Sequence, residues 1–183
     1  AIARSLLEGF VRGDLNPSEV FDPDLMGKFI AVADVWGSNH VLRWHNMRFY
    51  FNPITALLEP IGFDAHLHEE ENVVPNAFEE PIISAILEGD PIIKSVFRKT
   101  VERLAREIEE KKTQKWFHTL AQKQLRILHK EFPSLNGFSF ERIAKRAKEV
   151  ISLTQQSGKN YPEVLQVRNI KSKAGRYLEL LNP

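Results

Sequence analysis

The feature that most constrains this chain is a change in its hydrophobic period near residue 47. From Met47 to Phe51, apolar side chains alternate with Arg48 and Tyr50, and a second strand-like run extends over Leu57 to Phe63. Residues 52–55, which follow the first run, begin with Asn and Pro, which are typical of turns. A β-hairpin is therefore predicted, and the apolar runs on both sides of it repeat at helical spacing.

The remaining apolar runs predict helices. Asp22 before Pro23 and Asp90 before Pro91 are typical helix starts, because Asp caps the free amides and Pro is tolerated in the first turn. The predicted helices cover residues 3–12, 23–37, 80–88, 91–111, 116–133, 140–158 and 172–181, and the polar stretch 65–76 is predicted to be a loop. We expect one mainly α domain with one small β-hairpin (α+β), spanning 1–183.

Charge is distributed unevenly. The net charge is +1, but residues 1–90 carry a balance of −10 and residues 91–183 one of +11. Solvated helix faces with Lys145, Arg146 and Lys148 are expected to pair locally and with the acidic half. Nucleic acid is not expected as a partner, because strands that interleave aromatic and basic residues for base stacking are mostly missing.

The composition excludes some structural features but does not indicate a cellular location. The 183 residues include no Cys, which excludes disulfides and thiolate metal sites. No apolar run approaches the ~20 residues of a membrane span, so no transmembrane segment is expected. The cell envelope, a secreted location and the cytoplasm are all compatible with this composition.

The open end of the predicted hairpin carries a candidate metal site. Asn46 comes just before the first strand and Asp64 just after the second, so an antiparallel pairing brings the two close together. An amide oxygen and a carboxylate can hold a hard cation such as Mg²⁺ or Mn²⁺. The same residue types are also common as turn and cap residues, so both interpretations stay open.

These residues resemble a known family. The segment Val32 to His68 is similar to the spore-coat CotH family of atypical protein kinases, with looser agreement at Gly89-Asp90-Pro91 and Phe97-Arg98. The close similarity rests on Asp34-Val35-Trp36-Gly37, Asn46, Phe49-Tyr50, Asn52-Pro53 and Pro60-Ile61-Gly62-Phe63-Asp64.

The resemblance implies the C-lobe of a kinase-like fold that transfers a phosphoryl group from ATP to a serine of an acceptor protein. It implies Asn46 and Asp64 as ligands of Mg²⁺ or Mn²⁺ bound with ATP. The family usually has an acidic residue shortly before the Asn, whereas residues 38–42 contain none. His40 is the candidate general base there, because imidazole exchanges protons near neutral pH. Arg43 and Arg48 are candidate phosphate contacts.

A kinase site also needs a phosphate-covering loop and a lysine from an N-terminal lobe. Only 21 residues precede Asp22, and no strand among them carries a lysine. We therefore expect this chain to be part of a longer CotH-like protein, lacking the N-lobe and not turning over ATP alone.

Two other functions remain possible. His45, Asp64, His66 and His68 could form the site of a transition-metal-dependent hydrolase. Alternatively, the chain is a non-catalytic helical interaction or assembly module derived from a kinase lobe, with Trp116, Phe117 and Phe132 as a partner surface or as core.

Overall fold

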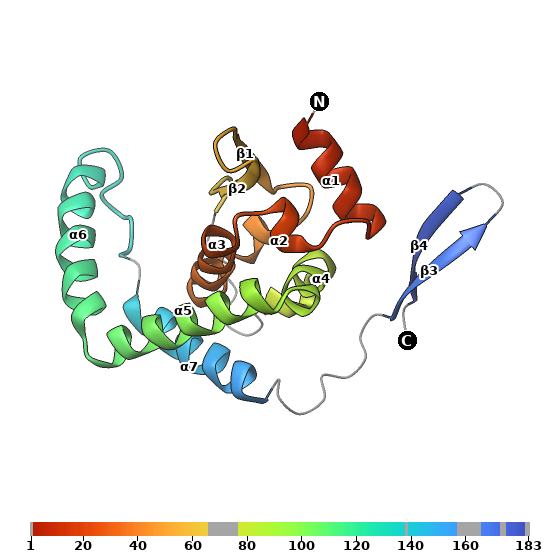
Figure 1. The fold of residues 1–183 in the computed structure, drawn as a ribbon. Coiled ribbons are helices and arrows are strands. Elements are labelled where there is room, and N and C mark those ends of the chain that lie inside the picture. The colour runs from red at the N-terminus through yellow and green to blue at the C-terminus, as the bar shows by residue number, and fades with distance from the viewer. Residues whose placement is uncertain (1, 66–76, 138, 157–165, 173–174, 182–183) are drawn as a thin grey trace.

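The computed structural model describes residues 2–65, 77–137, 139–156, 166–172 and 175–181 (Figure 1). Within these residues the fold is mainly helical, with small antiparallel sheets. The α-helices are α1 (Ile2–Arg12), α2 (Pro17–Val20), α3 (Pro23–Trp36), α4 (Pro81–Gly89), α5 (Pro91–Glu109), α6 (Lys112–Leu128) and α7 (Phe140–Gln156). The short 3₁₀ helices are η1 (Asn39–Leu42) and η2 (Ala77–Glu79), and the strands are β1 (Arg48–Asn52), β2 (Leu57–Ile61), β3 (Gln166–Ser172) and β4 (Gly175–Leu181).

The core lies where α3, α5 and α7 pack against one another. Met26 and Ile30 of α3 and Phe97 and Val101 of α5 are fully buried. Gly27 allows α3 and α5 to approach closely, because a Cβ atom there would lie only 2.9 Å from the carbonyl oxygen of Ile93. This packing fixes the end of α3, from which the candidate site begins.

Helix α3 is delimited as its sequence predicts. The Asp22 carboxylate accepts a hydrogen bond from the amide of Leu25 at 2.9 Å, and Pro23 occupies the first turn. Gly37 ends the helix with a φ of 67°, a left-handed conformation that costs glycine little. The chain can therefore turn sharply into η1.

The predicted hairpin is confirmed, with the first strand shifted by one residue and the second two residues shorter than expected. β1 pairs antiparallel with β2 from Arg48 opposite Ile61 to Asn52 opposite Leu57. Its inner face packs on the segment before α3, because Phe21 bridges to Leu58 and its ring lies 5.2 Å from that of Phe49. The hairpin is thereby held against the start of α3.

Asp90 links α4 and α5 to the N-terminal segment. Its carboxylate accepts hydrogen bonds from the amides of Ile92 and Ile93 and from the amide of Ser18, 72 positions away. Burial alone would raise the pKa of Asp90, but hydrogen bonds from Ser18, Ile93 and Ile92 outweigh it and hold the pKa below its usual value. Asp90 therefore caps α5, as predicted, and also joins this helix to the N-terminal segment.

The predicted helices up to residue 156 are all present, with ends shifted by a few residues. The predicted terminal helix 172–181 is wrong, because residues 175–181 form β4 and pair antiparallel with β3, in which Ser172 is the last residue. The expectation of one hairpin is therefore corrected to two hairpins in the described residues. Of the predicted loop 65–76, residues 66–76 lie outside the described residues, as does the predicted helix end at 158. No helix in the described part of the chain is long and apolar enough to cross a membrane.

Candidate functional site

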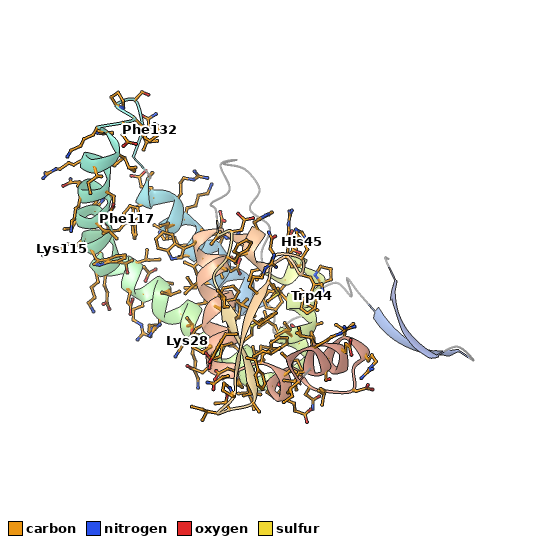
Figure 2. The ribbon with its side chains drawn as sticks, turned by 90° about the horizontal axis from the view of Figure 1, so that it is seen from above. Lys28, Trp44, His45, Lys115, Phe117 and Phe132 are labelled. Atoms are coloured by element: carbon orange, nitrogen blue, oxygen red, sulfur yellow. The ribbon has the colours of Figure 1, made fainter. Side chains whose placement is uncertain are left out.

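The candidate site lies where the connection after α3 meets the open end of the β1–β2 hairpin. The connection contains η1, which places His40 on a short turn between the buried residues Asn39 and Val41. Trp44 and His45 follow before β1 begins, and Figure 2 shows these two residues side by side. The site is thus built from the connection on one side and the end of β2 on the other.

Asn46 lies within this connection and is 8% exposed. Its side-chain amide nitrogen donates a hydrogen bond to the carbonyl oxygen of His40 at 3.2 Å. Its backbone amide donates to the carbonyl of Arg43 at 2.8 Å, which closes a turn. The nitrogen of the Asn46 side chain is therefore engaged within the connection itself.

Asp64 approaches His40 from the other side. One carboxylate oxygen, Oδ2, lies 3.0 Å from Nε2 of the His40 ring, and the Asp64 side chain is 47% exposed. The backbone of Asp64 has a φ of 55°. Asp adopts this left-handed region more readily than most residues, although at some cost, and such strain is concentrated at functional sites.

The structure thus brings the three predicted residues His40, Asn46 and Asp64 together through His40. The carbonyl of His40 accepts from Asn46, and its ring contacts Asp64. The donor set, a carboxylate and an amide oxygen, fits a hard cation such as Mg²⁺ or Mn²⁺.

The two candidate phosphate contacts are engaged within the protein. The Arg43 guanidinium lies 3.5 Å from the Glu80 carboxylate. The Arg48 guanidinium donates to the carbonyls of His45 and Met47, and its carbon lies 4.8 Å from the centre of the Phe63 ring. Arg48 therefore closes the end of the hairpin, and either side chain would have to leave these contacts to reach a phosphate.

The residues of the predicted transition-metal site are only partly described. The ring of His45 lies 6.1 Å from that of His40, edge to face. His66 and His68 lie outside the described residues. Among those that the structure describes, no group of three or more His, Cys, Asp or Glu side chains is placed to hold a metal ion.

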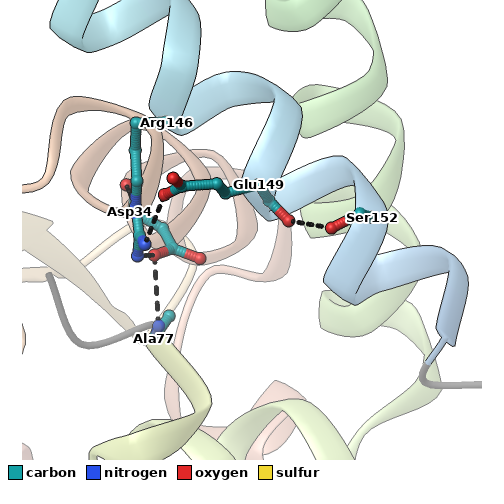
Figure 3. A network of polar contacts seen from close by, with 5 residues as sticks. All are labelled: Asp34, Ala77, Arg146, Glu149 and Ser152. Atoms are coloured by element: carbon teal, nitrogen blue, oxygen red, sulfur yellow. Dashed lines mark hydrogen bonds and ion pairs between the residues drawn. The ribbon is translucent and has the colours of Figure 1, made fainter. Parts of the chain in front are cut away.

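A buried carboxylate behind the site was assigned no role from its position in the sequence. Asp34, near the end of α3, is 1% exposed and pairs with Arg146 of α7 at 2.7 Å (Figure 3). Arg146 also donates to the Asp34 carbonyl at 3.1 Å, and the amide of Ala77 donates to the Asp34 carboxylate at 3.2 Å. Asp34 thus ties three segments together beneath the connection that carries His40.

The expectation of a solvated face at Arg146 is wrong, because Arg146 is buried. It does pair with the acidic half of the chain, as expected. Burial raises the pKa of Asp34 to about 6, although the charge and the hydrogen bond of Arg146 act in the opposite direction. An Asp 112 positions from its partner carries no local sequence signal for this pairing.

Comparisons with protein-family models, with curated proteins and with solved structures each returned no match to this chain.

Proposed function

We propose that this chain binds ATP with Mg²⁺ or Mn²⁺ at the open end of the β1–β2 hairpin and forms the helical lobe of a CotH-like kinase that phosphorylates a serine in an acceptor protein. The observation that carries this proposal is that His40 contacts both residues from the two sides of the hairpin, Asn46 through its backbone carbonyl and Asp64 through its ring. The resemblance in sequence assigns metal-binding roles to Asn46 and Asp64, and His40 lies in the segment where the family usually has an acidic residue.

In this proposal Asp64 and Asn46 hold the cation, which would neutralise charge on the phosphates of ATP. Asn46 is oriented for that task by its bond to His40, and Asp64 by the His40 ring. Such preorganisation matters because phosphoryl transfer depends chiefly on positioning and electrostatics rather than on covalent chemistry by the protein.

His40 has a second possible task, as the base that accepts the proton of the acceptor hydroxyl. When Nε2 of a neutral imidazole donates to the Asp64 carboxylate, Nδ1 is the remaining acceptor. A carboxylate that holds a histidine in one tautomer is a recurrent arrangement in acid–base catalysis. His40 would then act as the proton acceptor in place of the carboxylate that is missing from residues 38–42.

The test is calorimetric titration of the chain with ATP and Mg²⁺, repeated on Asp64→Asn. Asn removes the charge yet also tolerates the left-handed backbone, so the fold should be kept better than in Asp64→Ala. We expect affinity for the metal–nucleotide to fall at least about tenfold, since even residues behind the ligands contribute that much in metal sites.

The matched control is Asp14→Asn. Asp14 is 48% exposed and pairs with Arg12, so it resembles Asp64 in exposure and in having a basic partner, but it lies at the end of α1. This variant should bind as the wild type does. Equal affinity of wild type and Asp64→Asn, or no binding of the metal–nucleotide to either, would refute the proposal.

The transition-metal hydrolase remains a separate hypothesis. Zinc found by elemental analysis after mild purification, and lost in His45→Ala, would favour it. Nucleotide binding that requires Mg²⁺ would exclude it, because hydrolysis at a His-rich site needs no nucleotide.

A further inference from the structure

Helix α6 differs from the other long helices in that none of its residues is buried. It begins at a sharp corner after α5, where Lys111 has a φ of 58°. Figure 1 shows α6 upright at the edge of the molecule, and in Figure 2 Lys115, Phe117 and Phe132 lie far from Trp44 and His45. The helix is therefore separate from the candidate site.

One side of α6 attaches it to the core. The Phe117 ring lies 5.3 Å from that of Phe140 in α7 and 6.2 Å from that of Trp36 in α3. Ala121 and Leu125, one and two turns further on, are half-buried on the same side. The remaining apolar side chains of α6 do not share this packing.

A second apolar side faces outward. Trp116 is 60% exposed and Ile127 is 54% exposed, and Leu120 is exposed between them. At ~100° per residue these three fall within about 40° of one another, so they form one line along the helix, here called the α6 stripe. Leu128, the last residue of α6, is exposed on the side of Phe117, and Phe132 and Leu135 are exposed beyond the end of the helix.

Positive charge borders the α6 stripe. The helix contains Lys112, Lys115, Lys123 and Arg126 and no Asp or Glu, and Lys112 pairs with Glu110 just before the helix. At helical spacing Lys112 and Lys123 lie next to the stripe, and Lys115 and Arg126 lie a little further around the same side. An exposed apolar line beside a face that carries several Lys and Arg side chains is typical of helices that lie in a membrane–water interface.

We propose that α6 binds the surface of an anionic phospholipid bilayer, with the α6 stripe inserted and its basic side chains on the lipid headgroups. A lipid surface fits better than a protein partner for two reasons. Protein–protein interfaces are depleted in Lys, whereas anionic lipids attract each Lys or Arg near the surface. In addition, the core of this protein already covers one side of α6, so a groove on a partner protein could not enclose the helix. A flat lipid surface needs to contact only the exposed side.

The test is sedimentation of the whole chain with phosphatidylcholine vesicles containing about a third phosphatidylserine. Binding is expected to these vesicles and not to pure phosphatidylcholine, and to weaken at about 0.5 M salt because screening shortens the reach of the charges. Replacing Lys115, Lys123 and Arg126 with Gln should reduce binding at least about tenfold.

The matched control removes the same charge from α5 by replacing the exposed Arg98, Lys99 and Arg103 with Gln. It should bind nearly as the wild type does, whereas an equal loss in both variants would show only a general attraction and overturn the proposal. Brominated lipids locate the contact, since they should quench fluorescence in wild type and Trp44→Phe but much less in Trp116→Phe. Absence of vesicle binding would also overturn the proposal. Capture of the chain by calcium-loaded calmodulin, used as a probe with an acidic groove, would then indicate that α6 binds a protein instead.

Discussion

At the scale of single residues, Asp34 shows how a carboxylate can serve the fold rather than the chemistry. It is held by Arg146 and Ala77 beneath the connection that carries His40. A buried pair of this kind is weak evidence for stability, because the cost of removing two charges from water offsets their attraction. Its visible role is to fix where α3, α7 and η2 meet.

The raised pKa of Asp34 predicts a pH dependence of stability. Between the unfolded pKa near 3.8 and the folded value of about 6, the folded state holds the Asp34 proton more tightly than the unfolded state does. This contribution to the free energy of unfolding is therefore present below pH 3.8 and is lost as the pH rises to about 6, by up to about 3 kcal/mol.

Comparison with Asp34→Asn isolates this contribution from other carboxylates. Denaturant unfolding from pH 4 to 7 should give a wild-type free energy that falls relative to that of the variant as the pH rises. A difference that rises instead would show that Arg146 lowers the pKa of Asp34 and would contradict the account.

His40, Asn46 and Asp64 show what the sequence could predict of the site. Their gathering follows from the hairpin, which period and turn residues identify. The sequence could not predict two features of the site, the left-handed backbone of Asp64 and the contact of Arg48 with the Phe63 ring. Both depend on the path of the chain after β2, for which the sequence holds no local pattern.

At the scale of secondary-structure elements, the crossing of α3 and α5 depends on Gly27. A Cβ atom there would lie 2.7 Å from the Val96 Cβ and 2.9 Å from the Ile93 carbonyl oxygen. Gly27→Ala should lower the free energy of unfolding by about 1 to 3 kcal/mol, although Ala favours an isolated helix by about 1 kcal/mol.

Gly89→Ala is the matched control, measured by the same denaturant unfolding. Gly89 is the last residue of α4, and a Cβ there would meet Pro17 at 3.6 Å, an ordinary contact. Its effect should stay within about 0.5 kcal/mol. A neutral or stabilising Gly27→Ala would mean that the helices cross less closely than described.

The C-terminal elements show why the last predicted helix was wrong. Residues 172–181 are rich in Lys, Arg, Leu and Glu, which favour helices, yet 175–181 form β4 and pair with β3. Helix propensity predicts secondary structure only weakly, and strand pairing can override it. The partner strand lies outside the short stretch of sequence on which the helix prediction was based. Helices α3 and α5 were predicted well because their caps and apolar stripes are local.

At the scale of the whole molecule, the acidic and basic halves of the chain meet at separate points. Asp34 with Arg146 joins them inside the core, and Asp90 joins α5 to the N-terminal segment. The hairpin end and α6 lie apart on the same body. A nucleotide at the first and a lipid surface at the second could therefore be bound together.

The central claim, a cation site at the end of the hairpin, is tested most directly by titrating the chain with Mn²⁺ and ATP and recording proton–nitrogen NMR spectra. Mn²⁺ broadens nearby signals, so the Asn46 side-chain amide and the His40 ring should broaden first, while His118 on α6 stays sharp. In Asp64→Asn this selective broadening should be lost. Equal broadening at His40 and His118, or unchanged broadening in Asp64→Asn, would contradict the account.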